Sequence, residues 1–291
     1  MATLGILSVV AAIGAAVAFF GRRAAPSIAE GADLLASVRR RTAVWRWSGI
    51  AAGTVIACVA AIAGALGRGL LLAAPLFGLF VLLGVLGGEL SVRAPVVMTR
   101  KAAIRVRRAR DYLPRRLSSA VTAAGCALTG LLVATTAMGS ADDMGRAGRA
   151  LARQCTSALS QSHGAWAGSY YSIPLAVVVL FGLAAAVCTL HRVVRRPRPG
   201  DPSVLTAADD LLRRRAADAV TGACGVLITI PLIGVSLVTA SALLSITCRP
   251  TVWTVWAWSL IALAPAWVVL LGWSGLAIVG RSQTAVTARP A

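Results

Sequence analysis

The sequence is poor in charged residues, and this shortage decides its class. Only 13% of its 291 residues are Asp, Glu, Lys or Arg, whereas 58% are hydrophobic. A soluble globular domain carries about 25% charged residues, so the composition is too apolar for a water-soluble fold. The mean hydropathy of +0.79 indicates a membrane protein. A spanning helix needs roughly 20 apolar residues, so the chain is long enough for several spans.

Asparagine is absent, and Lys101 is the one lysine among 29 basic residues. Without asparagine the chain has no acceptor site for N-glycosylation. Codon bias in a GC-rich genome explains both shortages. The sequence has only two histidines: His163 falls in a loop predicted outside, and His191 at the predicted inner end of an apolar run. They therefore cannot share a metal ion or a catalytic triad. We expect no catalytic, cofactor or metal site, and a chain that is not an enzyme.

Long uncharged stretches account for most of the chain. Seven apolar runs have the length of a spanning helix and contain no Asp, Glu, Lys or Arg in their cores: 2–20, 47–66, 69–89, 117–138, 173–191, 219–246 and 252–279. A charge at a helix centre costs about 2.5–3.5 kcal/mol on insertion scales. The pattern predicts an all-α polytopic transmembrane bundle of about seven spans, forming a single integral membrane domain over 1–291.

The basic residues divide unevenly between the two sets of loops. The set 21–46, 89–116, 192–218 and 280–291 holds 24 of them, and the set 67–68, 139–172 and 247–251 holds five. Cytoplasmic loops carry the excess of Lys and Arg, so the N-terminus is predicted outside and the C-terminus in the cytoplasm. Nothing basic precedes the first run, and Arg22 and Arg23 follow it, as in a retained span rather than a signal peptide. Short clusters of this kind argue against nucleic-acid binding.

A short element recurs before three of the runs. Residues 110–122 and 209–221 align without gaps and share Ala-Val-Thr at their ends, and a looser copy begins near Ala32. This repetition predicts one leading helix followed by three helical hairpins. The residues that recur, and that could dock a partner or lipid, are Asp33, Asp111, Arg115, Arg116, Asp210, Arg214 and Arg215.

Two interpretations of this element stay open. Its leucines can rest at the headgroup boundary while its arginines reach the phosphates of anionic lipids, which makes it an interfacial helix. Alternatively, it forms a docking surface for a cytoplasmic protein partner, such as an ATPase or a regulator.

The loop 139–172 is the largest segment predicted outside. Cys155 lies in it, and Cys248 falls on the same, potentially oxidising side, so the two are predicted to form a disulfide. Asp142, Asp143 and His163 lack the ligand spacing of a metal site and are typical of an ordinary solvated loop.

Small residues recur at four-residue spacing in the second and third runs. Gly49 and Gly53 lie in the second run, and Gly84 and Gly88 lie in the third. Such spacing permits close approach between membrane helices.

Three short stretches resemble segments of other proteins: Gly-Glu-Leu-Ser-Val-Arg-Ala-Pro (88–95), Arg-Asp-Tyr-Leu-Pro-Arg (110–115) and Ala-Ala-Asp-Asp-Leu-Leu-Arg (207–213). With them the chain resembles a group of multipass membrane proteins from high-GC actinobacteria, over the second to seventh runs. The resemblance implies a bacterial plasma membrane and carries over no catalytic residue.

Two classes of function remain. The first is a non-enzymatic membrane component or accessory subunit of a transport system, whose cytoplasmic loops engage a partner. The second is a membrane sensor or signalling protein that reads the outer loop 139–172. The spans contain no ionisable residue in their cores, which argues against proton or sodium coupling through a buried acid.

Overall fold

A computed structural model describes residues 30–63, 67–91, 112–157, 159–195 and 203–279. These residues form six helices and two strands: α2 (Glu30–Ala63), α3 (Arg68–Ser91), α4 (Arg115–Ala137), β1 (Ala150–Gln154), β2 (Ser160–Gly164), α5 (Ser169–Arg195), α6 (Ser203–Ser245) and α7 (Thr251–Val279). Each of the six helices is long and apolar enough to cross a membrane, so the chain is a membrane-embedded helical bundle. The predicted run at 2–20 lies outside the described residues, and a seventh span stays a prediction.

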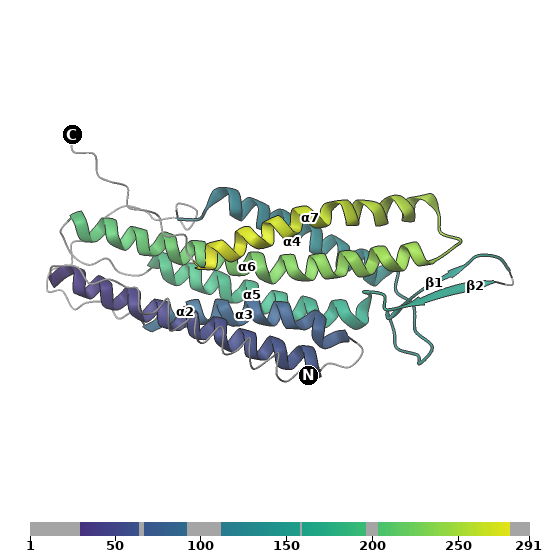
Figure 1. Ribbon diagram of the computed structural model, residues 1–291, viewed down its shortest axis with the longest axis horizontal. Helices are drawn as coiled ribbons and strands as arrows, with labels where there is room; N and C mark the ends of the chain where they lie inside the picture. The colour runs from purple at the N-terminus through teal and green to yellow at the C-terminus, as the bar shows by residue number, and fades with distance from the viewer. Residues whose placement is uncertain (1–29, 64–66, 92–111, 158, 196–202, 280–291) are drawn as a thin grey trace.

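The helices run side by side along the long axis of the molecule (Figure 1). The segment 138–168, which includes the two strands, projects at one end and is named the cap. At the other end α2, α4 and α6 begin and α5 finishes, and most of the described arginines lie there. We name this the basic end.

Helix α6 lies at the centre of the bundle. In its most hydropathic window 67% of the residues are buried, against 11% for α2 and 17% for α7. The outer two helices each pack along one neighbour, α2 on α3 and α7 on α6. Their remaining apolar surface faces the surroundings, as a lipid-exposed surface does.

The prediction of three helical hairpins is wrong for the second pair. Helix α4 packs mainly on α6, whereas α5 lies against α3 and α6, and the two make little contact with each other. The helices of the first and third pairs are separated by only a few residues in the sequence, and such short connections favour antiparallel neighbours. Between α4 and α5 the long cap intervenes, so chain connectivity does not force these two helices together.

The predicted close approach of glycines is confirmed where α2 crosses α3. A Cβ atom placed on Gly49 would lie 2.8 Å from the Cα of Gly84, and Gly53 lies similarly against Phe77. A second close approach joins Gly78 of α3 to Leu227 of the central helix α6. Because lipid tails are as apolar as leucine, such fit between surfaces drives association in the bilayer.

Two of the predicted cytoplasmic loops are largely helical. Helices α2 and α6 begin before the predicted apolar runs at 47 and 219, so the predicted loop segments 30–46 and 203–218 are continuous helix with those runs. Both extensions are rich in Ala, Leu and Arg, which are strong helix formers. In the remaining copy of the repeat Pro114 has extended backbone (φ −69°, ψ 97°) and α4 begins at Arg115, since proline has no N–H to continue a helix from its N-terminal side.

The cap contains an antiparallel hairpin that the all-α prediction did not include. Its strands pair from Ala150 with Gly164 to Gln154 with Ser160. Leu151 of β1 and Trp166 are fully buried and pack with Leu243 at the end of α6. The cap therefore has a small hydrophobic core of its own, built on the end of the central helix.

Candidate functional sites at the two ends of the bundle

Exposed arginines from three helices gather at the basic end. They come in adjacent pairs near the starts of α2, α4 and α6, and they are Arg40, Arg41, Arg115, Arg116, Arg214 and Arg215. His191, Arg192 and Arg195 at the end of α5 are also exposed. The structure thus brings together four of the predicted docking residues, and adds cations from α2 and α5. The result is a positively charged surface that can bind phosphates or carboxylates.

The predicted acidic residues contribute less to this surface. Asp210 is partly buried, and the Tyr112 hydroxyl lies 3.4 Å from its Oδ1. Asp33 lies in α2, in a stretch whose side chains are outside the described residues, and Asp111 is also outside them. Arginine therefore dominates the exposed, described part of the basic end.

Arg213 is a structural residue that the repeat alignment did not reveal. It is only 1% exposed, and its Nη1 donates to the carbonyl oxygens of Val193 (2.7 Å) and Val194 (3.2 Å) at the end of α5. These carbonyls have no acceptor role inside their helix, and a cation suits the negative end of the helix dipole. Arg213 therefore fixes the extension of α6 onto the end of α5.

One sequence signal could have identified Arg213. Three consecutive helical residues point in directions about 100° apart, so Arg213, Arg214 and Arg215 cannot all face away from the bundle. In the repeat alignment, however, Arg213 stands opposite Pro114, so the alignment does not mark it as a shared position.

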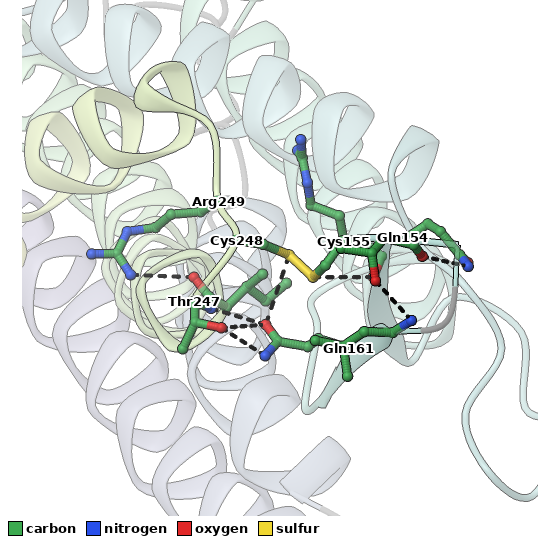
Figure 2. Close-up of a disulfide and its surroundings, with 10 residues drawn as sticks. Gln154, Cys155, Gln161, Thr247, Cys248 and Arg249 are labelled. Atoms are coloured by element: carbon green, nitrogen blue, oxygen red, sulfur yellow. Dashed lines mark hydrogen bonds between the residues drawn. A yellow bond between two sulfur atoms is a disulfide. The ribbon is translucent and has the colours of Figure 1, made fainter.

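A disulfide joins the cap to the turn between α6 and α7. Cys155 follows β1, Cys248 follows α6, and their Cα atoms are 5.7 Å apart although 93 positions separate them in sequence (Figure 2). This is the pair proposed from the sequence. Beside it the Gln161 side chain donates to the Thr247 hydroxyl (2.6 Å) and accepts from the Thr247 amide (2.9 Å). The cap is thus held on the end of α6 by a covalent bond and by hydrogen bonds.

Two arginines strengthen this junction. The Nη1 atom of Arg249 donates to the carbonyls of Leu244 (2.8 Å) and Ile246 (3.2 Å), which closes the end of α6. The guanidinium of Arg153 in β1 lies 4.9 Å from the ring centroid of Trp253 in α7, within the range of a cation–π interaction. Both ends of the turn between α6 and α7 are therefore anchored.

Asp142 organises the first part of the cap. Its carboxylate accepts from the guanidinium groups of Arg146 (2.8 Å) and Arg149 (2.6 Å), and its side chain is 8% exposed. Burial raises the pKa of the carboxyl, but hydrogen bonds from the Arg146 amide, the two guanidinium groups and the Met144 amide outweigh it. These bonds hold the pKa of Asp142 well below its usual range. The expectation of an ordinary solvated loop is wrong here.

Trp166 connects the cap to the end of α4. Its indole Nε1 donates to the carbonyl of Thr135 near the end of α4 (2.6 Å), and its amide donates to the carbonyl of Arg149 (2.9 Å). Close by, Gly148 has φ +70°, a conformation that L side chains rarely adopt, and its carbonyl packs against Gly168. The cap is consequently a defined structure rather than a flexible connection.

Among the residues that the structure describes, no three of His, Cys, Asp and Glu come together as metal ligands. Asp142 is occupied by two arginines, while His163 lies in β2, opposite Leu151. Comparison with known protein families, curated proteins and solved structures finds no match to this chain.

Proposed function

We propose that this chain is a non-enzymatic membrane component, acting as an accessory subunit of a transport system, whose basic end docks a cytoplasmic protein. The single observation that carries the proposal is the fixed extension of α6. This helix has 43 residues, roughly 65 Å at 1.5 Å per residue, which is longer than the ~30 Å hydrocarbon core requires. Its extension presents exposed Arg214 and Arg215 while Arg213 is bonded to α5.

The chemistry of the surface defines the partner. Exposed arginines on α2, α4 and α6 complement a protein with an acidic surface. Leu211, which is 49% exposed, lies four residues before Arg215 on the same face of α6 and adds apolar contact. Because Arg213 already orders the extension, a partner spends little free energy on ordering it. An ATPase or a regulator of a transport system fits this description.

The proposal places the basic end in the cytoplasm and the cap outside. The uneven distribution of 24 and five basic residues supports this orientation. The disulfide between Cys155 and Cys248 supports it independently, because disulfides persist in oxidising compartments outside the cytosol.

Quantitative co-purification with two matched double variants tests the docking. The tagged chain is extracted in mild detergent from cells that carry it at native level, and the partner is quantified by mass spectrometry. Arg116→Gln with Arg214→Gln removes two charges from the basic end, and we expect the partner to be lost and its retention to depend on salt. Arg68→Gln with Arg153→Gln removes two charges at the other end and should leave it bound. Equal recovery with both double variants would contradict the proposal.

A sensor that reads the cap is a second candidate, and one observation favours it. The disulfide and Gln161 attach the cap to the end of α6, and the same helix carries Arg214 at the basic end. In a sensor, Cys155→Ser should change the rate at which a cysteine at position 211 reacts with a maleimide. An unchanged rate would argue against transmission along α6.

A further inference from the structure

Arg46 of α2 lies on the side of its helix that faces the bundle. It precedes Ile50 by four residues, which places both on one helix face, and Ile50 packs against the buried core. Its Nε atom is buried and has no hydrogen-bond partner. An N–H donor is therefore held inside the bundle, near the basic end, without an acceptor.

In the part of the chain that the structure describes, no carboxylate balances the charge of Arg46. The group that acts on it electrostatically is Arg215 of α6, which is another cation. Two carboxylates of α6 interact with other groups. Asp210 lies beside the Tyr112 hydroxyl, and Asp218 interacts electrostatically with Arg214. A buried charge without a counter-ion and a buried donor without an acceptor are both costly. An anion between α2 and α6 would remove both costs.

We propose that Arg46 and Arg215 bind the phosphate group of an anionic phospholipid from the leaflet at the basic end. A guanidinium group presents its N–H donors in a fork that matches phosphate oxygens. Arg46 lies in the candidate span Arg40–Ala63 and directly precedes the uncharged run that begins at Trp47, where a helix is expected to meet the lipid headgroups.

The neighbours of Arg46 favour a lipid over a free phosphate ion. Val44 and Trp45 are 60% and 46% exposed, and with Trp47 they lie within one turn of Arg46, at the same level of α2. Tryptophans are enriched at the level of the headgroups. An acyl chain gains contact with these exposed side chains, whereas an inorganic phosphate ion does not.

This lipid site shares Arg215 with the proposed docking surface, but Arg46 belongs to the lipid site alone, so the two proposals can be tested separately. It uses Arg46, which faces inward, and Arg215, whereas docking is tested with Arg116 and Arg214. If Arg116→Gln with Arg214→Gln leaves partner recovery unchanged while Arg46→Gln weakens lipid binding, docking alone is refuted. If the first pair loses the partner while Arg46→Gln binds lipid like the wild type, the lipid site alone is refuted.

The full chain in detergent is titrated with phosphatidylglycerol or with phosphatidylcholine of the same acyl chains, and bound lipid is counted by native mass spectrometry. We expect binding of phosphatidylglycerol to dominate, and Arg46→Gln to weaken it roughly tenfold, the usual effect of losing charge-assisted hydrogen bonds. Arg215→Gln should weaken it in the same direction. Arg116→Gln removes one exposed charge of the same end and should leave binding within about twofold.

The difference in Tm between Arg46→Gln and the wild type is a second readout, and we expect its sign to change when phosphatidylglycerol is added. In lipid-free detergent Arg46→Gln should raise Tm, because it removes a half-buried charge whose buried Nε has no acceptor. With phosphatidylglycerol the wild type should become the more stable protein. Wild-type affinity in Arg46→Gln and Arg215→Gln, equal binding of phosphatidylcholine, or an equal rise of Tm with inorganic phosphate alone would each overturn the proposal. If Arg46→Gln does not fold, Arg215→Gln decides the result.

Discussion

The buried guanidinium of Arg213 joins two helices through the carbonyls of Val193 and Val194. Arg214, the next residue, is exposed and belongs to the charged surface. Within one turn of α6, one arginine is therefore buried and joins two helices, while the next is exposed to the surroundings. At the scale of single residues, burial decides the role of an arginine more than its position in a cluster does.

Arg213→Met should lower the stability of the bundle, because two carbonyls at the end of α5 lose a charged donor. We expect a loss of about 1.5–3 kcal/mol in the free energy of unfolding, the usual value for hydrogen bonds to charged groups. Arg214→Met, which changes an exposed neighbour, should stay within about 0.5 kcal/mol of the wild type. Denaturant unfolding in detergent measures both, and equal stabilities would refute the role given to Arg213.

Gly49→Ala should destabilise the contact between α2 and α3. The new Cβ would lie 2.8 Å from the Cα of Gly84, so the helices must separate, and overpacking of this kind costs about 1–3 kcal/mol. Gly272→Ala in α7 is the matched control, because a Cβ there meets nothing within 4 Å. Thermal unfolding of the two variants side by side should show a lower Tm only for Gly49→Ala.

At this scale the sequence predicts the role of a residue where that residue type usually has one structural role. Gly49 and Gly84 fitted the spacing of close helix contacts, and Cys155 and Cys248 shared a predicted compartment. Arg46 and Arg213 were hidden, because membrane topology also places many arginines in the same loops. Only their depth in the folded bundle separates them from exposed arginines.

The cap is the element on which the structure and the all-α prediction differ most. Its second strand, Ser-Gln-Ser-His-Gly, contains no β-branched or large aromatic residue, so it lacks the usual strand signal. The hairpin is stabilised instead by its surroundings, namely the disulfide and the buried pair of Leu151 and Trp166. Contacts distant in sequence cannot be read from a local pattern.

Asp142→Asn should loosen the first part of the cap, because the carboxylate binds both Arg146 and Arg149. We expect faster hydrogen exchange over 142–149, with exchange in α6 unchanged. Asp143→Asn alters the exposed neighbour and should exchange like the wild type. Comparable protection of this segment in both variants would contradict the role of Asp142.

The same carboxylate predicts the pH dependence of the cap. Because the folded pKa of Asp142 is lowered, its contribution is complete above the unfolded value of about 3.9. It is lost only as pH falls below that value, towards the folded pKa. Exchange-based stability of the cap should therefore be constant from pH 7 to pH 5 and fall below about pH 4. A decline centred near pH 6 would contradict this assignment.

Cys155→Ser should release the cap from the turn between α6 and α7. On a non-reducing gel the wild type is expected to migrate differently from its reduced form, and Cys155→Ser should abolish the difference. Cys188→Ser, which replaces a free cysteine, should preserve it. Complete labelling of both Cys155 and Cys248 by thiol reagents in intact cells would show that the bond does not form there.

At the scale of the whole molecule, the spans could be predicted and their arrangement could not. Helices α2 to α7 occupy the predicted apolar runs because a backbone inside lipid must satisfy its own hydrogen bonds, and a run of apolar residues marks where this happens. Which helix packs on which depends on the fit between side chains. The central position of α6 and the separation of α4 from α5 therefore follow from the structure alone.

Labelling of single cysteines from the two sides of the membrane tests the central claim most directly. With the four free cysteines replaced and the disulfide kept, one cysteine is introduced at Met144 in the cap or at Leu211 at the basic end, both of which are exposed. An impermeant maleimide should label position 144 in intact cells, and position 211 only after permeabilisation. Labelling of 211 but not 144 in intact cells would contradict the proposed orientation, and with it the cytoplasmic docking surface.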